Sequence, residues 1–508
     1  MTWQTSVQAN KLGFARGGPN PIPRLDQGSP PKTEQKHLVV HIARSKSIVQ
    51  DMALPDPPFP PSGRFIECIH ESSRALTQAE LVTFSIRQGA TASGMASWRP
   101  QRLISLYLLS SSGYANISDA NIERLLLSSA FTETYHRTAT SHGLAFPLKF
   151  PSPLSELNFI SILALLNIAS GYRVPLRRET GRGAWDSMRA FVFGLYLSST
   201  TDGEGDLLGA RGMQTLSETK IGELLGVSLH TERQHENIQG VTISQVGGPG
   251  WELVRLLKTI LDETGKVLVD GGFVAEALKE GARVAHQKVD PASAADVVLE
   301  RLVRAIPGFR DMSIVNNRPI FCFKKALFLI NAVNVRFGAR DPSPFPVPQT
   351  SHLPVFADDM LPSILIHLGI IDLSTAAPAL ARLFPAPATA TSAADAVAVA
   401  AAADPALSLA AAPETATRAA DAVPVVDGPV LTPAQAYVLR AAAIEACERI
   451  VACARDMGAA VERGGGGGGG GAPPWLKDVT PPDLNNWLWA VANDRALPGF
   501  VLRNTTFF

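Results

Sequence analysis

The sequence predicts a mainly α-helical protein, on two observations. First, apolar residues recur at helical spacing in long runs such as "WELVRLLKTILDETGKVLVDGG", where Leu253, Leu257 and Ile260 share one helix face. Second, the alternation typical of strands is scarce, and only "GVTISQVGG" (240–248) and "RPIFCF" (318–323) are fair candidates. Helices should therefore form most of the core.

Local signals place the ends of these helices. The first run should end before Gly272, and "SAADVVLERLVRAIPGF" should be capped by Ser293 and stopped at Pro307. "LPSILIHLGIIDL" carries Pro362 in its first turn and reaches Gly369 at its end. "AQAYVLRAAAIEACERIVACARDMG" is another long amphipathic run, so helices extend toward the C-terminus.

Low-complexity segments divide the chain. Residues 1–62 are rich in Pro and Gly and should be disordered, apart from a short strand at "HLVVHIA". Residues 377–426 are dominated by Ala, interrupted by prolines, and predict a flexible insert. The parts 63–376 and 427–508 should together form a single large helical domain, the second part containing a glycine linker at 464–471.

Composition excludes several classes of protein. The 46 basic residues balance the 46 acidic ones, which gives no overall positive field for coating nucleic acid, although a local basic pocket stays open. No apolar run reaches the length of a membrane span, and the first residues lack the pattern of a secretory signal. We therefore expect a cytoplasmic protein, or one that is also nuclear, without nucleic-acid or membrane partners. Its oligomeric state stays open.

Cofactor motifs are also missing. The four cysteines, Cys68, Cys322, Cys447 and Cys453, are scattered and predict buried thiols rather than disulfides or a zinc site. There is no GxxxxGK[ST] and no HExxH, and "GGPG" (247–250) lacks the context of a dinucleotide-binding loop, so it predicts a turn. We expect no metal and no cofactor.

Two stretches could carry chemistry. In "RPIFCFKKALFLI", Lys324 and Lys325 either begin a helix and extend to water or hold a fixed cation for a phosphate or carboxylate. In "LPVFADDMLPSILIHLG", Asp358 and Asp359 either cap the following helix or place a carboxylate in a cavity. His367 shares a helix face with Ile364 and, from spacing alone, predicts a core histidine.

Several stretches together resemble the queuosine salvage protein family, the queuosine 5′-phosphate N-glycosylases. The matching pieces occur in family order from about residue 63 to the last residue. They are "FIECIHESSRAL", "ELNFISILALLN", "GAWDSMRAF", "LSETKIGELL", "ILDETGKVLVDGG", "LVRAIPGFRD", "FCFKKALFLI", "LPVFADDMLPSILIHLG", "AAIEACERI" and "NNWLWAVAND…LRNTTFF". The ordered set is more specific than any one piece.

The resemblance implies an all-helical fold similar to that of DNA glycosylases. It also implies cleavage of the N-glycosidic bond of queuosine 5′-monophosphate, which releases queuine for reuse in tRNA. Asp358, in "F-A-D", would be the catalytic carboxylate, with Asp359 capping or assisting, and Lys324 would engage the phosphate or sugar. The further residues that the resemblance assigns to substrate binding are Phe356, Phe323, Trp185, Asn158, His367 and Arg503, with a structural role also open for His367. Arg503, Phe507 and Phe508 match the basic-then-aromatic ending of the family and would close the pocket.

The sequence also departs from the family pattern. Ala332 and Ala490 stand where family members commonly carry acids, and Asp359 stands where many carry an aromatic residue. A catalytically degenerate paralogue, which binds a modified nucleoside or base without cleaving it, is therefore the alternative to an active hydrolase. A helical DNA-repair glycosylase is a third possibility, which the balanced charge disfavours.

Overall fold

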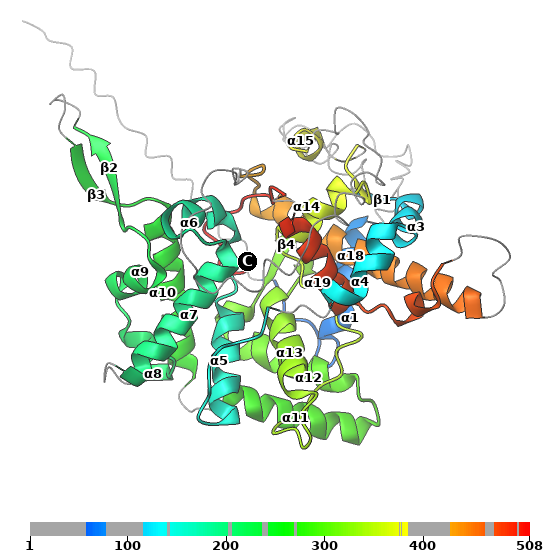
Figure 1. Ribbon diagram of the computed structural model, residues 1–508, viewed down its shortest axis with the longest axis horizontal. Coiled ribbons are helices and arrows are strands. Elements are labelled where there is room, and N and C mark those ends of the chain that lie inside the picture. Colours follow the sequence, from blue (N-terminus) through cyan, green and yellow to red (C-terminus); the bar gives the residue numbers. More distant parts are fainter. Residues whose placement is uncertain are drawn as a thin grey trace, which may run out of the picture. The chain divides into compact units, whose positions relative to one another are not determined.

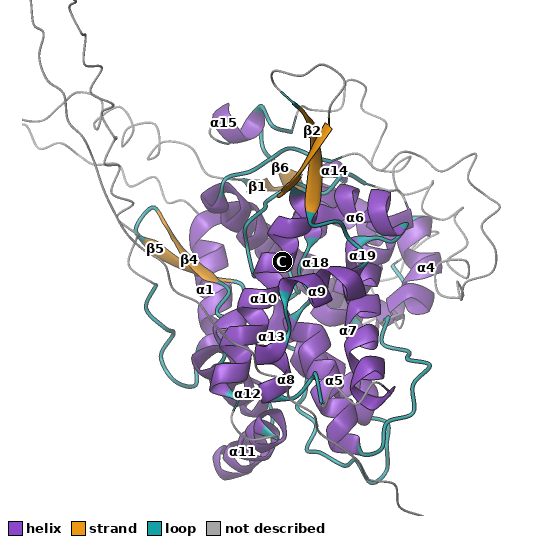
Figure 2. Ribbon diagram, turned by 90° about the vertical axis from the view of Figure 1, so that its left-hand side faces the viewer, coloured by secondary structure: helices purple, strands orange, loops and turns teal. Residues whose placement is uncertain are grey.

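Helices dominate the part of the chain that the structure describes, which confirms the predicted mainly α fold (Figures 1 and 2). The computed structural model describes residues 57–77, 115–139, 143–201, 206–235, 242–268, 272–374, 376, 378–384, 427–462, 472–494 and 497–508. All of them belong to the unit Leu54–Phe508. The strand expected at "HLVVHIA", most of the alanine-rich insert and the glycine linker lie outside the described residues.

The helices of the described residues follow one another in chain order. They are α1 (Phe65–Thr77), α3 (Asp119–Leu126), α4 (Ser129–Ala139), α5 (Pro153–Leu165), α6 (Arg173–Thr180), α7 (Ala184–Thr201), α8 (Ala210–Thr215), α9 (Glu218–Leu225), α10 (Pro249–Val267), α11 (Phe273–Lys288), α12 (Ser293–Ala305), α13 (Lys324–Phe337), α14 (Met360–His367), α15 (Pro378–Ala381), α18 (Pro433–Glu462) and α19 (Pro481–Asp494). The 3₁₀ turns are η1 (Ser170–Tyr172), η2 (Pro307–Phe309) and η3 (Pro474–Asp478).

The described strands form three separate antiparallel pairs. They are β1 (Asn116–Ile117) with β6 (Ile371–Asp372), β2 (His230–Gln234) with β3 (Thr242–Val246), and β4 (Met312–Val315) with β5 (Arg318–Phe321). Both strands predicted from sequence are confirmed as β3 and β5. The β2–β3 hairpin projects from the helices (Figure 1). Every residue of its two strands is exposed except Thr231, which is half-buried.

The long helix α18 lies at the centre of the C-terminal half. It contacts α1, α3, α14 and α19, and its buried face is rich in alanine, which lets neighbouring helices approach closely. Two side chains on this buried face are charged, Arg440 and Glu445, and Arg440 is fully buried. A buried charge needs a partner, and Arg440 finds its partners next to the candidate site.

Helices α5 and α13 pack against each other and bring the candidate site together. At the start of α5, buried Glu156 accepts hydrogen bonds from Arg336 and Arg340 near the end of α13 (2.6 to 3.0 Å). This ion-pair cluster fixes one end of the antiparallel contact. The other end of each helix, with Leu165 and Lys324, is left to form the site.

Helix ends agree with the sequence in part. Pro307 follows the end of α12, and Gly369, with φ 67°, follows α14 as expected. Ser293 is not the cap, because it is the first residue of α12 and its hydroxyl donates to the carbonyl of Asp290 (2.8 Å). The predicted turn "GGPG" is wrong in part, because Pro249 already begins α10.

The last residues of the N-terminal segment 1–62 are packed, contrary to the prediction. The Ser62 hydroxyl donates to Glu300 (2.6 Å), and the carbonyl of Pro60 accepts from Arg304 (3.2 Å), so this stretch lies on α12. All four cysteines are free thiols and three are buried, in line with the prediction. Within the described residues no single helix is long and apolar enough to cross a membrane; only the bent pair α5 and Ser170–Thr180 reaches that length and composition together.

Candidate functional site

Asp358 caps the following helix with one carboxylate oxygen and faces Lys324 with the other. Its Oδ1 accepts the backbone amides of Met360 (2.9 Å) and Leu361 (3.3 Å), and so caps the first turn of α14. Its Oδ2 lies 3.9 Å from Nζ of Lys324, and the side chain is 11% exposed. The carboxylate is therefore fixed by the helix start while one oxygen faces a cation.

Asp359 does not cap the helix, and the expectation that it would do so was wrong. Its side chain makes no capping hydrogen bond, and its Oδ2 lies instead 3.3 Å from Nη1 of Arg173 at the start of α6. Burial, followed by the neighbouring charge of Asp358, raises the pKa of Asp359 to about 6. Arg173 and the hydroxyl of Ser170 act in the opposite direction but do not cancel the cost of burial.

Lys324 is the first residue of α13 and is nearly buried. Its Nζ donates to the carbonyl and to the side-chain oxygen of Asn167, both at 3.2 Å. Burial lowers the pKa of Lys324, while Asp358 and Asp359 act to raise it. Sequence reasoning missed Asn167, which follows α5 by two residues; only the packing of α5 against α13 brings it to the lysine.

Lys325 serves the fold rather than the surface. It is fully buried, and its Nζ donates to the carbonyls of Leu165 (2.9 Å) and Thr506 (2.6 Å). Burial lowers the pKa of Lys325 to about 7. The interpretation that these two lysines extend to water is therefore wrong for both. Lys325 ties the end of α5 to the last residues of the chain.

Three aromatic side chains contact one another in a series of rings. The ring of Phe328 meets that of Trp185 (5.6 Å between centroids) and that of Phe356 (6.1 Å), edge to face in both cases. Trp185 and Phe328 are half-buried and Phe356 is buried. Phe328 was not predicted, although it follows Lys324 by four residues and so shares its helix face.

Phe323 does not join these rings. It is fully buried in the core, where its ring packs against Phe65 and Phe321 (both 5.8 Å), and we no longer assign it to the substrate. Its left-handed backbone, with φ 46°, turns the chain from β5 into α13. Its contribution is therefore to set the direction of Lys324.

Three other predicted residues lie in α5, in α14 and in the C-terminal segment. Asn158 is half-buried in α5, about 10 Å along the helix axis from Leu165, and His367 is the exposed last residue of α14, about 10 Å from its start. The prediction of a core histidine was wrong. Arg503 donates through Nε to the carbonyl of Gly171 (3.1 Å) and lies over the ring of Tyr172, so it holds the η1 turn.

The C-terminal residues 497–508 cover the other side of the acidic pair. The carbonyl of Gly499 accepts from Nη2 of Arg173 (3.1 Å), and a Cβ at Gly499 would lie 2.3 Å from Oδ2 of Asp359. A side chain at this position would have to displace the carboxylate of Asp359. Phe507 is half-buried, while Phe508 is buried with its ring 4.3 Å from the guanidinium carbon of Arg440. Phe508 is thus part of the core rather than of a closing flap.

The positions that depart from the family pattern lie on helices. Ala332 is fully buried in α13, two turns beyond Lys324, and Ala490 is half-buried in α19. Neither can supply a charge.

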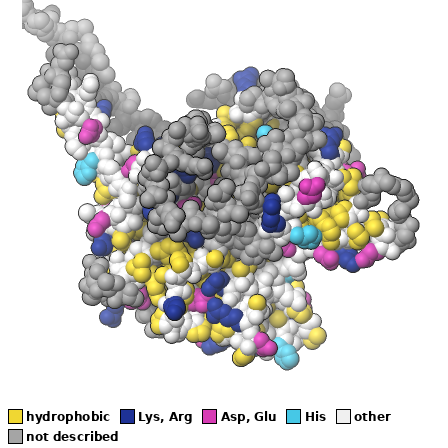
Figure 3. Space-filling model, in the orientation of Figure 1, with side chains coloured by type: hydrophobic (Ala, Val, Ile, Leu, Met, Phe, Trp, Pro, Cys, Tyr) yellow, Lys and Arg dark blue, Asp and Glu magenta, His cyan; other side chains and the backbone are white. Residues whose placement is uncertain are grey.

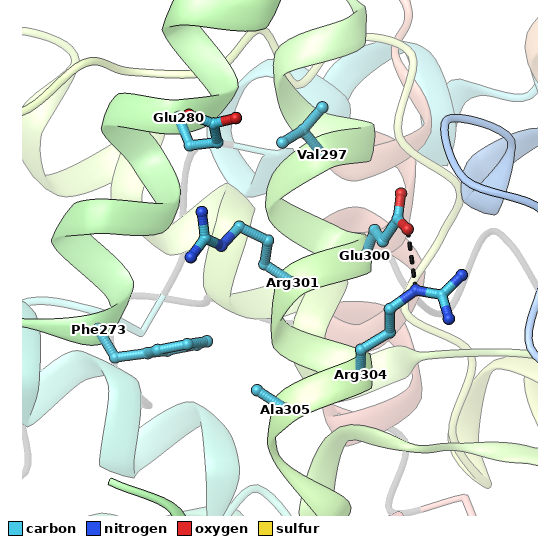
Figure 4. A pocket seen from close by; sticks show the side chains of 7 residues that line it. All are labelled: Phe273, Glu280, Val297, Glu300, Arg301, Arg304 and Ala305. Atoms are coloured by element: carbon cyan, nitrogen blue, oxygen red, sulfur yellow. Dashed lines mark hydrogen bonds and ion pairs between the residues drawn. The ribbon is translucent and has the colours of Figure 1, made fainter. Parts of the chain in front are cut away.

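Two hollows of defined volume lie elsewhere in the described part of the chain. One of 460 Å³ lies between α11 and α12, where Arg301 extends between Glu280 and Phe273 (Figure 4). The other, of 530 Å³, lies between α11 and residues 346–349. Neither is lined by a predicted site residue. Within the described ranges, no group of three or more His, Cys, Asp or Glu side chains could hold a metal ion.

One face of the molecule shows how its charged side chains are distributed (Figure 3). On the uncovered part of the face in Figure 3, Lys and Arg side chains are scattered among acidic ones and form no continuous stripe. A protein that binds duplex DNA needs several such cations aligned on the phosphates.

A known family model matches part of the chain. Residues 249–382 match the family model described as queuosine salvage protein, which confirms the resemblance over this segment. The segment includes Lys324, Phe328, Asp358 and Asp359 and excludes Trp185 and the C-terminal residues. No curated protein matches the chain. The match supports a role in queuosine salvage.

Proposed function

Residues 249–382 match the queuosine salvage protein family. We propose that this protein hydrolyses the N-glycosidic bond of queuosine 5′-monophosphate and releases queuine. One observation carries the proposal. Asp358 and Lys324, 34 positions apart in this segment, meet with 3.9 Å between Oδ2 and Nζ, and that oxygen accepts no hydrogen bond from a described residue.

The geometry suits an N-glycosidic cleavage. As the bond between C1′ and the base nitrogen breaks, positive charge develops on the sugar, and a fixed carboxylate stabilises it. Water then adds to C1′, and Oδ2 of Asp358 accepts its proton, while the departing base nitrogen takes a proton from solvent. Because Oδ1 is held by two amides, the carboxylate needs no reorientation during the reaction.

Lys324 and the aromatic rings would bind the substrate. Two of the three ammonium hydrogens of Lys324 go to Asn167, which leaves one for a phosphate or sugar oxygen. The rings of Trp185, Phe328 and Phe356 offer apolar surface for a flat base, whose stacking contributes about 1–3 kcal/mol per contact.

The test is queuine release from queuosine 5′-monophosphate, followed by mass spectrometry in the presence of EDTA. The wild type should release queuine, and Asp358→Asn should lose most of this activity. Asp186→Asn is the matched control, because Asp186 is an exposed carboxylate that pairs with Arg189 one turn away. Activity that disappears with EDTA would contradict a metal-independent reaction, and no release by the wild type would refute the proposal.

The alternative is a paralogue that binds the nucleotide without cleaving it. It is favoured by Ala332 and Ala490, which stand where family members commonly carry acids. It predicts that queuosine 5′-monophosphate raises the melting temperature by mass action while no queuine appears. Stabilisation together with product separates the two functions in one experiment.

A further inference from the structure

We infer that Asp311 and Arg440 form a positioning pair, which holds the backbone of Lys324 at a fixed distance from the backbone of Asp358. The inference rests on the proposed function for its kinetic consequence, but its geometry stands independently. Both side chains are fully buried, and Arg440 lies in α18, outside the matched segment.

Asp311 fixes the lysine side of the site. Its Oδ2 accepts the backbone amide of Lys324 (3.1 Å), which is the first residue of α13. Its own carbonyl accepts the amides of Cys322 (3.0 Å) and Phe323 (3.2 Å). Three successive backbone amides thus donate to Asp311. Asp311 therefore fixes the backbone from which the side chain of Lys324 extends.

Arg440 connects Asp311 to the carboxylate side. Its two terminal nitrogens donate to the two oxygens of Asp311, at 2.9 Å for Nη1, in a bidentate pair. Its Nε donates to the carbonyl of Ala357 (2.8 Å), the residue directly before Asp358. One guanidinium therefore joins the backbone at both reacting side chains.

Neighbouring groups restrain the pair further. The hydroxyl of Tyr437, one turn before Arg440, donates to Oδ1 of Asp311 (2.9 Å), and the ring of Phe508 lies 4.3 Å from the guanidinium carbon. Each oxygen of the Asp311 carboxylate and each nitrogen of the guanidinium has a partner. A pair so fully bonded has one arrangement, which is what a positioning role requires.

Stability alone does not explain such a pair. Two buried charges cost several kcal/mol each in desolvation, and replacing a buried pair with apolar residues of similar size is often neutral or stabilising. Catalysis is far more sensitive, since a misplacement of about 1 Å can cost 10²-fold in rate. The two effects can therefore be separated by substitution.

The first experiment compares Arg440→Lys with Arg336→Lys. Both substitutions keep a charge beside a buried carboxylate, but Arg336 binds Glu156 at the far end of α13. Arg440→Lys loses the bidentate pair with Asp311 and the hydrogen bond to the carbonyl of Ala357. We therefore expect kcat to fall at least tenfold, with a smaller change in KM. Arg336→Lys should lower the melting temperature without changing kcat at 25 °C.

The second experiment removes the charges together, in Asp311→Leu with Arg440→Met. This protein should stay folded, with kcat reduced at least tenfold and a crystal structure in which the 3.9 Å separation between Lys324 and Asp358 has changed. If the double variant does not fold, the kcat of Arg440→Lys still tests the inference. Wild-type kcat in either folded variant, or an unchanged 3.9 Å separation, would overturn the inference. The crystallographic result holds even if the wild type cleaves no substrate, so the two proposals fail separately.

Discussion

Replacing Asp358 by Asn and by Ala separates the two roles of its carboxylate. Both substitutions remove the negative charge that faces Lys324 at 3.9 Å. At an effective dielectric constant of about 20, this attraction is about 4 kcal/mol as an upper limit, and Lys324 can relieve its loss by releasing its proton. The electrostatic cost is the same in both variants and cancels when they are compared.

The stability lost with the helix cap differs between the two variants. Asn accepts the amides of Met360 and Leu361 as well as Asp does, whereas Ala leaves both without a side-chain partner. Asp358→Ala should therefore be less stable than Asp358→Asn by about 1 kcal/mol, which for a protein of this size is a shift in melting temperature of ~2 °C or less. Denaturant unfolding measures this difference more accurately than heating.

The two variants should differ in stability but should lose activity to a similar extent. A lost general base or charge-stabilising group costs about 10²–10⁴ in rate, so both variants should release queuine at least a hundredfold more slowly than the wild type. Release is followed by mass spectrometry under single-turnover conditions. If Asp358→Asn cleaves at the wild-type rate, Asp358 is only a cap. If the two variants are equally stable, the capping argument is wrong.

Three further predictions concern the surroundings of the pair. The pKa of Asp359 in the folded protein is about 6, against 3.8 for an ordinary aspartate, so its contribution to stability is present below about pH 4 and is lost as the pH rises through 6. The unfolding free energy measured from pH 4 to 7 should show this loss in the wild type but not in Asp359→Asn. Equal profiles for the two proteins would contradict the prediction. Phe328→Ala should raise KM about tenfold with a smaller effect on kcat, since stacking is lost while the charges stay, and steady-state kinetics that show an unchanged KM would exclude the ring from the substrate. Deletion of residues 386–426, most of the alanine-rich insert, should leave the unfolding free energy and the activity nearly unchanged, because a change in the length of a chain connection costs little. A protein that no longer folds would show that the insert is required.

The sequence determined the helices and the residue types at the site. Spacing of apolar residues indicated α10, α12, α14 and α18, and family-like motifs selected Asp358 and Lys324 before any contact was known. These features are local, because helical periodicity and capping depend on residues within a few positions of one another. For the same reason Phe328, four residues after Lys324, could have been found from sequence.

Only the tertiary structure decided which side chain does what. Asp358 and Asp359 are chemically identical neighbours, yet one caps α14 and faces Lys324 while the other meets Arg173, more than 180 positions away. Asn167 reaches Lys324, Gly499 reaches Asp359 and Arg440 reaches the carbonyl before Asp358, each from a segment distant in sequence. The physical reason is that a buried charge is assigned by its partners in space, and the sequence order does not contain those partners.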